Sequence, residues 1–402
     1  MDMSDKHSMS DALPSHDDSH LRSLLKIEEG LPLPVQNGEH GIDYYLYERY
    51  AADSQSWKRK AYYFLKPVIP RPVQIALRKK YVNVQAKGSF PAWPIEPVVV
   101  DAAKNFMLNV LSQADVPAIH RIAPWPDETT FAFAITHDVE WDTGLQHAQA
   151  LADIERDLGF TSSWNIVPER YPIDWSIIET LQSRGFEIGI HGLKHDGKLF
   201  QSRRVFEQRA AKIHQYAGDW KAVGFRSPST LRNVDWMPEL GFEYDSSFPD
   251  TDPYEPQPGG CCSIWPFFIR DLVELPLTMP QDHTLFEILG LRDISVWKQK
   301  ADWIEKMGGL VLINVHPDYM MSTERLRFYE GFLKHMKGKA AMWHALPKSI
   351  AQWWRNRDAS TLKREGGAYS IDGPDSSRSS ILRTSMKGGF LVDQVIRQGT
   401  PA

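Results

Sequence analysis

Cysteine is almost absent from this chain, which has two cysteines, Cys261 and Cys262, among 402 residues. Adjacent cysteines rarely reach the geometry of a structural disulfide, so a framework of disulfides is excluded. This composition is compatible with a reducing compartment. We expect the two thiols to be small buried hydrophobic groups, and a second metal site or a redox role is the alternative.

Long apolar runs are also missing, since the sequence has no stretch of the roughly eighteen apolar residues that a membrane-spanning helix needs. The first twenty residues are polar and acidic, which does not fit a secretory signal. The sequence therefore predicts a cytoplasmic protein.

No strong excess of charge of either sign is present, because 46 basic and 51 acidic residues give a formal net charge of -5. This balance argues against a nucleic acid partner. Hydrophobic residues make up 42% of the chain. That is enough for one large core with additional smaller segments.

Four segments are expected along the chain. The polar residues 1–30 and the Ser-, Gly- and Arg-rich residues 356–402 are predicted to be mostly disordered tails. Residues 31–125 form an α-rich extension with a helix at 102–114. Within it, residues 57–81 carry eight basic side chains among apolar ones, which favours either weak contact with an anionic membrane surface or a solvated helix broken by prolines. Residues 126–355 form the main domain.

In the main domain, apolar runs alternate with stretches of helical period. Strands are predicted at 131–136, 161–167, 186–190, 222–225, 272–275, 310–315 and 341–344. Helices are predicted at 145–158, 173–183, 203–216, 231–240, 296–306, 325–336 and 347–354. This alternation predicts an α/β fold with a parallel sheet, and the number of units favours a barrel. Functional residues should then lie at the carboxyl ends of the strands.

Acidic and histidine residues follow the predicted strands at the points where the strands end. Asp138 and Glu140 follow the first strand, and two positions apart on an extended segment they point to the same face. His191 follows the third strand, with His195 four residues later, a spacing that lets one helical turn hold one metal ion. Each pair alone is a weak signal, because such spacings arise by chance.

Two further strands end in the same way. Arg226 follows the strand at 222–225, and His316 follows the strand at 310–315. Taken singly, Arg226 could form a surface ion pair, and His316 before Pro317 could be a turn residue. The shared position of all these side chains at strand ends predicts one site.

The order of these motifs resembles that of the polysaccharide deacetylase (NodB homology) family. That family has a T-F-D-D-type strand end, then H-[ST]-x-x-H, R-x-P, an Asp-containing motif and a strand that ends in His. The matching segments here are 136–140, 191–195, 226–228, 244–247 and 312–316. The resemblance covers a little over half of the chain and implies a distorted (β/α) barrel with a metal centre.

The resemblance implies that His191 and His195 bind the metal and that Asp138 is the general base. The second aspartate of the family motif, a metal ligand, falls on Val139, which cannot bind a metal. Glu140 then supplies the third ligand, as in the acid-x-acid form of the motif. The alternative is that Asp138 binds the metal and Glu140 is the base. Zinc is the metal that the family implies, although iron, cobalt and manganese also suit two histidines and a carboxylate.

Three further roles follow from the resemblance. His316 is the general acid, Arg226 orients Asp138, and Asp245 is the acid that pairs with the catalytic histidine. Gly192 stands where the family has a small hydroxyl residue. Aromatic residues near the motifs are expected either to stack on a sugar ring or to pack in the core: Trp141, Tyr254, Trp265 and Tyr319.

The expected activity is hydrolysis of a non-peptide C–N bond, namely removal of an acetyl group from an N-acetylated sugar of a glycan or glycan precursor. One alternative is hydrolysis of a small cyclic amide or imide on the same fold. Another is a carbohydrate-binding protein without catalysis, in which the change at Val139 has removed the metal site. Acetate release, ring opening and metal content distinguish these three hypotheses.

Overall fold

The structure is a computed structural model, which describes residues 19–31, 41–54 and 90–399. Its centre is a nine-stranded sheet with the order β10-β2-β3-β4-β5-β6-β8-β7, in which β9 also pairs with β2. All pairings are parallel except that of β7 with β8. The strands are β2 (Phe131–Val139), β3 (Ser163–Ile166), β4 (Glu187–His191), β5 (Gly224–Arg226), β6 (Tyr244–Asp245), β7 (Phe267–Ile269), β8 (Leu272–Glu274), β9 (Leu310–Val315) and β10 (Met342–His344).

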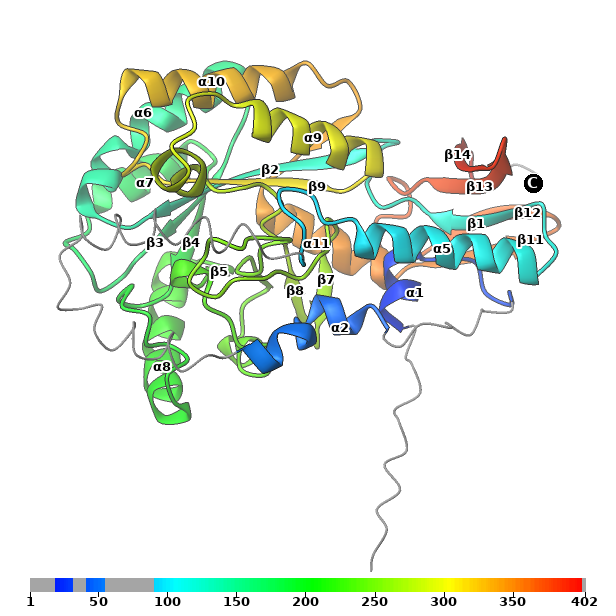
Figure 1. Cartoon of the computed structure of the whole chain (residues 1–402), viewed down its shortest axis with the longest axis horizontal. Coiled ribbons are helices and arrows are strands. Elements are labelled where there is room, and N and C mark those ends of the chain that lie inside the picture. Colours follow the sequence, from blue (N-terminus) through cyan, green and yellow to red (C-terminus); the bar gives the residue numbers. More distant parts are fainter. Residues whose placement is uncertain (1–18, 32–40, 55–89, 400–402) are drawn as a thin grey trace, which may run out of the picture.

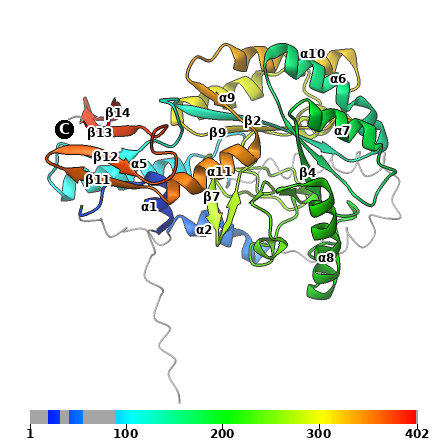
Figure 2. The same ribbon diagram turned by 180° about the vertical axis from the view of Figure 1, so that it is seen from behind.

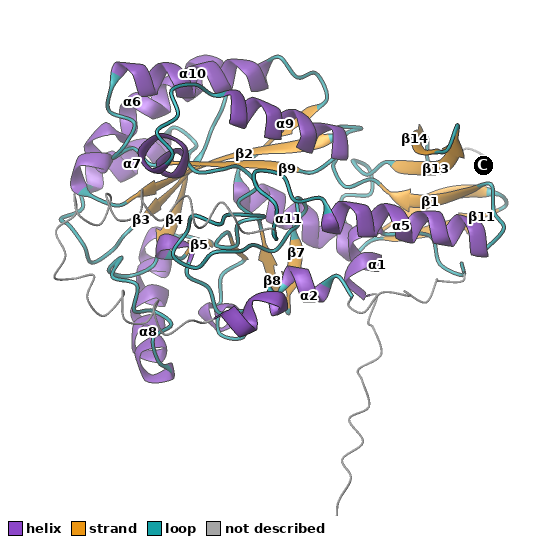
Figure 3. Cartoon of the chain, in the orientation of Figure 1, coloured by secondary structure: helices purple, strands orange, loops and turns teal. Residues whose placement is uncertain are grey.

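Helices cover the outside of this sheet (Figure 1, Figure 3). They are α6 (Asp142–Leu158), α7 (Trp175–Ser183), α8 (Arg203–Trp220), α9 (Ser295–Met307), α10 (Thr323–Lys337) and α11 (Pro347–Asp358). Asp174, Ser202 and Ser322 cap the amino-terminal ends of α7, α8 and α10 with side-chain oxygens. Shorter helical turns are η3 (Pro228–Thr230), η4 (Met237–Leu240) and η5 (His283–Ile288).

The sheet curls until its far side meets β9. After β8, the backbone N–H of Met279 donates to the carbonyl of Leu312 at 3.1 Å, and the Thr278 hydroxyl donates to the carbonyl of Leu310 at 2.6 Å. The predicted α/β fold, a distorted (β/α) barrel, is therefore confirmed.

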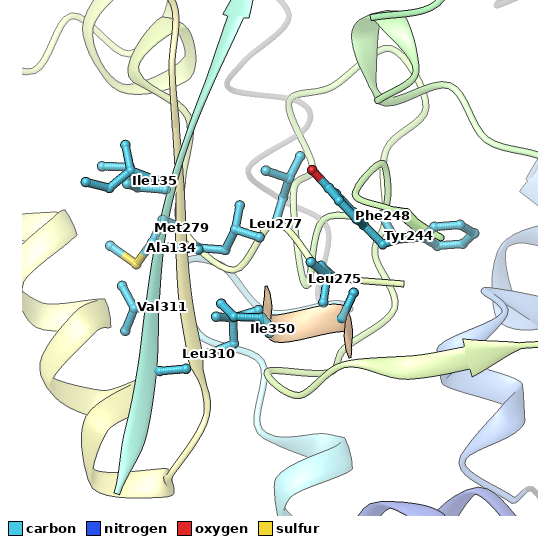
Figure 4. Packing of buried hydrophobic residues seen from close by; sticks show 14 of the residues in the cluster. Ala134, Ile135, Tyr244, Phe248, Leu275, Leu277, Met279, Leu310, Val311 and Ile350 are labelled. Carbon is cyan, nitrogen blue, oxygen red and sulfur yellow. The ribbon is translucent and has the colours of Figure 1, made fainter. Parts of the chain in front are cut away.

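The apolar core lies along the first half of β2 and β9. Figure 4 shows Ala134 and Ile135 of β2 and Val311 of β9 near Met279 and Ile350, all of which are almost completely buried. Three consecutive buried residues near the end of β2, Thr136, His137 and Asp138, are polar, and Val139 after them is apolar. The apolar first half of β2 packs in the core of the barrel. The polar residues near its end place their side chains at the carboxyl end of the barrel.

The prediction of a mostly disordered tail over residues 356–402 is wrong for most of that segment. It contains β11 (Thr361–Glu365), β12 (Ala368–Asp372), β13 (Ile381–Lys387) and β14 (Phe390–Ile396). β13 pairs antiparallel with β1 (Ala118–Ile122), which comes from the amino-terminal extension. β13 is partly exposed and obtains this partner from more than 250 residues away, and β14 is largely exposed and pairs with β13, so no local apolar period marks the two strands.

The prediction of a disordered tail over residues 1–30 is wrong for the described residues 19–30. α1 (Ser19–Leu25) buries Leu21 and Leu25 in the main core, and Ile27 forms a bridge with Arg121. The extension continues with α2 (Asp43–Leu46), η1 (Arg49–Ser54) and α5 (Val98–Gln113), which confirms the helix expected at 102–114. Residues 57–81, the segment considered for membrane contact, lie outside the described residues.

A buried arginine joins the amino-terminal helix and the end of β1 to α11. Arg357 of α11 is 1% exposed and donates to the carbonyls of Ser23, Leu24, Ile122 and Ala123 at 2.9–3.1 Å. Burial lowers the pKa of its guanidinium to about 9. The amino-terminal helix, β1 and α11 therefore form one packed unit, as Figure 2 shows from behind.

The helix predicted at 231–240 is also wrong, because only the short turn η4 is helical there. The Asn233 side chain accepts the backbone N–H groups of Asp235 and Trp236, which closes a turn instead of a helix. Among the helices in the described part of the chain, none is long and apolar enough to cross a membrane.

Candidate metal centre and active site

Three side chains at the carboxyl end of the barrel form a cluster suited to a metal ion. The ligand atoms of Glu140, His191 and His195 all lie within 4.8 Å of one another. Glu140 follows β2, His191 is the last residue of β4, and His195 lies in the following loop. Ligands bound at about 2.0–2.2 Å to one zinc ion lie roughly 3–4 Å apart. The 2.9 Å between Nε2 of His195 and Oε1 of Glu140 is close to this value, and the other ligand atoms lie within 4.8 Å.

The loop between the two histidines differs from the helical turn that their spacing predicted. Gly192 and His195 both have positive φ angles, of 62° and 53°. A Cβ atom at Gly192 would lie 2.6 Å from ring atoms of Pro228, so a larger residue does not fit. The backbone conformation of this chain and the close approach of Pro228 thus leave room only for glycine at position 192.

His191 and His195 both present a ring nitrogen to the cluster, and a hydrogen bond orients the ring of His191. His191 Nδ1 lies 3.1 Å from the carbonyl oxygen of Arg226, so Nδ1 carries the proton and Nε2 keeps its lone pair. Burial lowers the pKa of His191 to about 4, which favours the neutral imidazole. Nε2 of His195 is buried and lies 2.9 Å from Oε1 of Glu140, and within the described residues Glu140 is the group that faces it. This buried nitrogen lone pair beside a carboxylate fits a metal site.

Asp138 lies next to this cluster and is held by three donors. Its Oδ1 accepts from Asn165 at 2.9 Å, and its Oδ2 accepts from Asn314 at 2.9 Å and from Arg226 at 3.4 Å. Burial alone would raise the pKa of Asp138, but Arg226 and His191 hold it below its usual range. Oδ2 lies 4.0 Å from Nε2 of His191. The carboxylate is therefore ionised, close to the cluster and already occupied by hydrogen bonds.

Arg226 has the position expected for the residue that orients Asp138. Its side chain is 1% exposed and also donates to the hydroxyls of Thr136 at 3.2 Å and Ser246 at 3.0 Å. These contacts join the ends of β2, β5 and β6. The guanidinium thus fixes the Asp138 carboxylate in both position and charge.

The partner of His316 was predicted wrongly as Asp245. Nδ1 of His316 lies 2.7 Å from Oδ1 of Asp282, whose Oδ2 accepts the His316 backbone N–H at 2.9 Å. Burial alone would lower the pKa of His316, but Asp282 raises it to about 10. Asp245 instead accepts from the N–H and hydroxyl of Ser247, because it is the last residue of β6 and faces the buried Glu274.

Sequence reasoning also missed Asn165 and Asn314, the two amides that hold Asp138. Asn314 is a polar residue inside the apolar strand Leu310–Val315, and Asn165 interrupts β3 in the same way. A buried amide needs a partner, so these interruptions were usable signals. Asp282 follows the segment after β8, where no motif distinguishes it from a surface acid.

The four aromatic residues near the motifs fall into two groups. Tyr254 and Trp265 are buried, and the Trp265 indole donates to the carbonyl of Gly308, so both belong to the packing. Trp141 is 44% exposed directly after Glu140, and the guanidinium of Arg170 lies 3.6 Å from its ring centre. The Tyr319 hydroxyl lies 3.4 Å from Oε2 of Glu140.

Cys261 and Cys262 are free thiols and are completely buried. Burial raises the pKa of both, so they remain protonated at neutral pH. Within residues 19–31, 41–54 and 90–399, the cluster of Glu140, His191 and His195 is the one group suited to a metal, and it does not include the cysteines.

No protein family matches this sequence, and no curated protein matches it. Solved structures do match. A protein assigned as a polysaccharide deacetylase from Mycobacterium smegmatis is 20% identical, with 57% of this chain and 92% of that chain covered and a TM-score of 0.47. One with the same assignment from Pseudomonas aeruginosa PAO1 is 14% identical, with 61% and 96% covered and a TM-score of 0.45.

A third similar structure is that of PuuE allantoinase, which is 14% identical, with 58% of this chain and 93% of that chain covered and a TM-score of 0.45. Two of these similar structures are assigned as polysaccharide deacetylases, the family that the motif order resembles. The roles of individual residues depend on the geometry of this chain.

Proposed function

We propose that this protein is a metal-dependent hydrolase of a non-peptide C–N bond, which removes the acetyl group from an N-acetylated sugar of a glycan or glycan precursor. One observation carries the proposal. The carboxyl ends of the barrel strands bring together a two-histidine, one-carboxylate cluster, a buried ionised Asp138 and the Asp282-bound His316.

Glu140, His191 and His195 would hold the metal, and Asp138 would serve as base. A divalent metal, when bound, polarises an amide carbonyl and lowers the pKa of water from 15.7 to about 7. Asp138 is a weak candidate as a ligand, because two amides and Arg226 already occupy its oxygens. The same donors leave it ionised and aimed at the cluster, where it accepts a proton from the attacking water.

His316 completes the reaction by donating a proton to the departing amine nitrogen. An amine is a poor leaving group until it is protonated, so a positioned acid lowers the barrier. Asp282 holds the imidazole by Nδ1 and stabilises its charged form. Nε2 is then the nitrogen that gives the proton, and Arg226 keeps Asp138 from acting as a competing acid.

The donor set supports zinc as the metal, and a two-histidine, one-carboxylate site also suits iron, cobalt and manganese. For the substrate, Trp141 and Tyr319 place aromatic surface beside Glu140, as recognition of a sugar ring requires. We also propose a cytoplasmic location, supported by two buried free thiols, which would favour a glycan precursor over a polymer.

The decisive experiment measures two reactions of the zinc-loaded protein. Acetate release from N-acetylglucosamine oligomers and monomers is followed beside ring opening of allantoin, a small cyclic amide. We expect acetate release that Asp138→Asn abolishes. Ring opening without acetate release would favour the cyclic amide alternative, and sugar binding without either reaction would favour a carbohydrate-binding protein.

A further inference from the structure

The metal ligand Glu140 lies just outside the strand that delivers it. β2 ends at Val139, whose register partner is Ile166 of β3, and α6 begins at Asp142. Glu140 is therefore in a two-residue connection where no ladder hydrogen bond holds its backbone. A ligand must be held to within a few tenths of an ångström, so this backbone needs another anchor.

Asp318 supplies that anchor from the loop after β9. Its Oδ2 accepts the backbone N–H of Glu140 at 3.0 Å. Its Oδ1 accepts the backbone N–H of Gly144 at 3.0 Å and the hydroxyl of Thr143 at 3.1 Å. One carboxylate thus spans the whole connection, from the ligand residue to the first turn of α6.

The first turn of α6 is built to receive this carboxylate. Trp141, the residue before the helix, makes no side-chain capping bond, so Asp318 replaces the usual local cap. Helix amino termini favour a negative charge. Gly144 makes the approach possible, because a Cβ atom there would lie 2.5–2.8 Å from the carboxyl atoms of Asp318.

Two more contacts fix the same residue from either side. The Tyr171 hydroxyl donates to the carbonyl of Val139 at 2.8 Å, and the Tyr319 hydroxyl lies 3.4 Å from Oε2 of Glu140. Asp318 and Tyr319 are adjacent, so one loop holds both the backbone and the side chain of Glu140. The same loop follows His316 and thereby ties the metal ligand to the proposed acid.

We propose that Asp318 is a positioning residue for the metal centre, which fixes Glu140 as the third ligand and depends on Gly144 for its place. This inference rests on the proposed function, because it needs Glu140 to bind a metal. It explains how the acid-x-acid form of the motif works in this chain. The carboxylate of Glu140 lies one residue beyond the end of β2, and Asp318, whose carboxylate lies at the amino terminus of α6, holds the Glu140 backbone in place.

The test measures zinc affinity by competition with a chelator, in wild type, Asp318→Asn, Gly144→Ala and Gly218→Ala. Gly218 lies in another helix, α8, and a Cβ atom there meets nothing within 4 Å, so it is the matched control. We expect Asp318→Asn and Gly144→Ala to weaken zinc binding roughly 10- to 100-fold. Gly218→Ala should leave it unchanged.

A double-mutant cycle shows whether Asp318 acts through Glu140. Glu140→Ala should lose its metal on purification, so the cycle compares its residual affinity for added zinc. Asp318→Asn should not lower this residual affinity further, although in the wild-type background it weakens zinc binding strongly. The visible absorption of the cobalt-loaded protein should change in Asp318→Asn, which a purely structural loss would not produce in the folded fraction. Unfolding midpoints of the metal-free variants show that each is folded.

Three results would overturn the inference. Equal zinc affinity of wild type, Asp318→Asn and Gly144→Ala would overturn it alone and leave the proposed function intact. A further loss of affinity on adding Asp318→Asn to Glu140→Ala would mean that Asp318 acts elsewhere. A wild-type protein that binds no zinc or cobalt would overturn both the inference and the proposed function.

Discussion

Asp282 holds His316 by both its ring and its backbone, with Nδ1 at 2.7 Å from Oδ1 and the backbone N–H at 2.9 Å from Oδ2. The two residues are 34 positions apart, and Asp282 precedes the π-helical turn η5. This contact fixes which ring nitrogen points toward the cluster and stabilises the imidazolium. The histidine can then act as an acid at neutral pH.

Replacement of Asp282 by Asn should therefore impair catalysis more than metal binding. We expect kcat to fall about 100-fold or more, because general acid catalysis contributes roughly 10²- to 10⁴-fold. Zinc content should stay near wild type, since Asp282 contacts none of the three ligands in the described structure. The matched control is Asp245→Asn, which changes the acid first expected to pair with His316. An equal fall in kcat in Asp282→Asn and Asp245→Asn would contradict the assignment of Asp282 as the partner of His316.

Asp138→Asn distinguishes the base from a metal ligand. The two amides and Arg226 around Asp138 should leave the variant folded, and loss of the base should lower kcat by about 10²- to 10⁴-fold. Metal content by plasma emission spectroscopy should remain at one equivalent. Loss of the metal from Asp138→Asn, together with its retention in Glu140→Ala, would reverse the two roles.

Glu187 should make stability depend on pH. Burial raises its pKa to about 7 in the folded protein, from 4.5. Between these values the folded state binds more protons than the unfolded state, so stability falls as pH rises from about 4.5 to 7. The free energy of unfolding falls by on the order of 3 kcal/mol once Glu187 is ionised.

Urea unfolding of Glu187→Gln and wild type at pH 5 and pH 8 measures this effect. The variant should gain stability relative to wild type at pH 8 and little at pH 5, because the amide can still accept the hydrogen bond that the Tyr244 hydroxyl donates. Glu179→Gln, at an exposed position of α7, is the control. A difference between variant and wild type that is the same at both pH values would contradict the raised pKa.

Arg357→Met should destabilise the contacts of α11 with the amino-terminal helix and the end of β1. The variant leaves four carbonyls without the donor they share, and each unsatisfied buried group costs about 1–3 kcal/mol. We expect a loss of about 3 kcal/mol or more in the free energy of unfolding. The control is Arg355→Met, two positions earlier on the more exposed side of α11. It should lower the free energy of unfolding by less than about 1 kcal/mol. A loss of similar size in both variants would argue against the role of Arg357.

The barrel could be predicted from the sequence because its strands are buried on both faces. Leu310–Val315 is apolar except for Asn314 and forms β9 within the predicted bounds. β13 and β14 could not be predicted in this way, since both are partly exposed and β13, with which β14 pairs, has the distant strand β1 as its other neighbour. Contacts between residues that are far apart in the sequence do not produce a periodic pattern of apolar residues in either segment.

The same distinction applies to the site. Asp138, Glu140, His191 and His316 lie at the carboxyl ends of strands or directly after them, and topology alone brings such positions together. Asp282 and Asp318 were missed because each acts through a contact between loops, which depends on how two irregular segments meet. The conformation between His191 and His195 was also missed, because Pro228 rather than helical propensity decides it.

The central claim is tested most directly by the metal content of the purified protein beside His191→Ala and Glu140→Ala. His147→Ala, at a histidine of α6 outside the cluster, serves as control. We predict about one equivalent of metal in wild type and in His147→Ala, and loss of it in both ligand variants. A wild-type protein that takes up no metal, or a Glu140→Ala variant that holds it as tightly as wild type, would contradict the account.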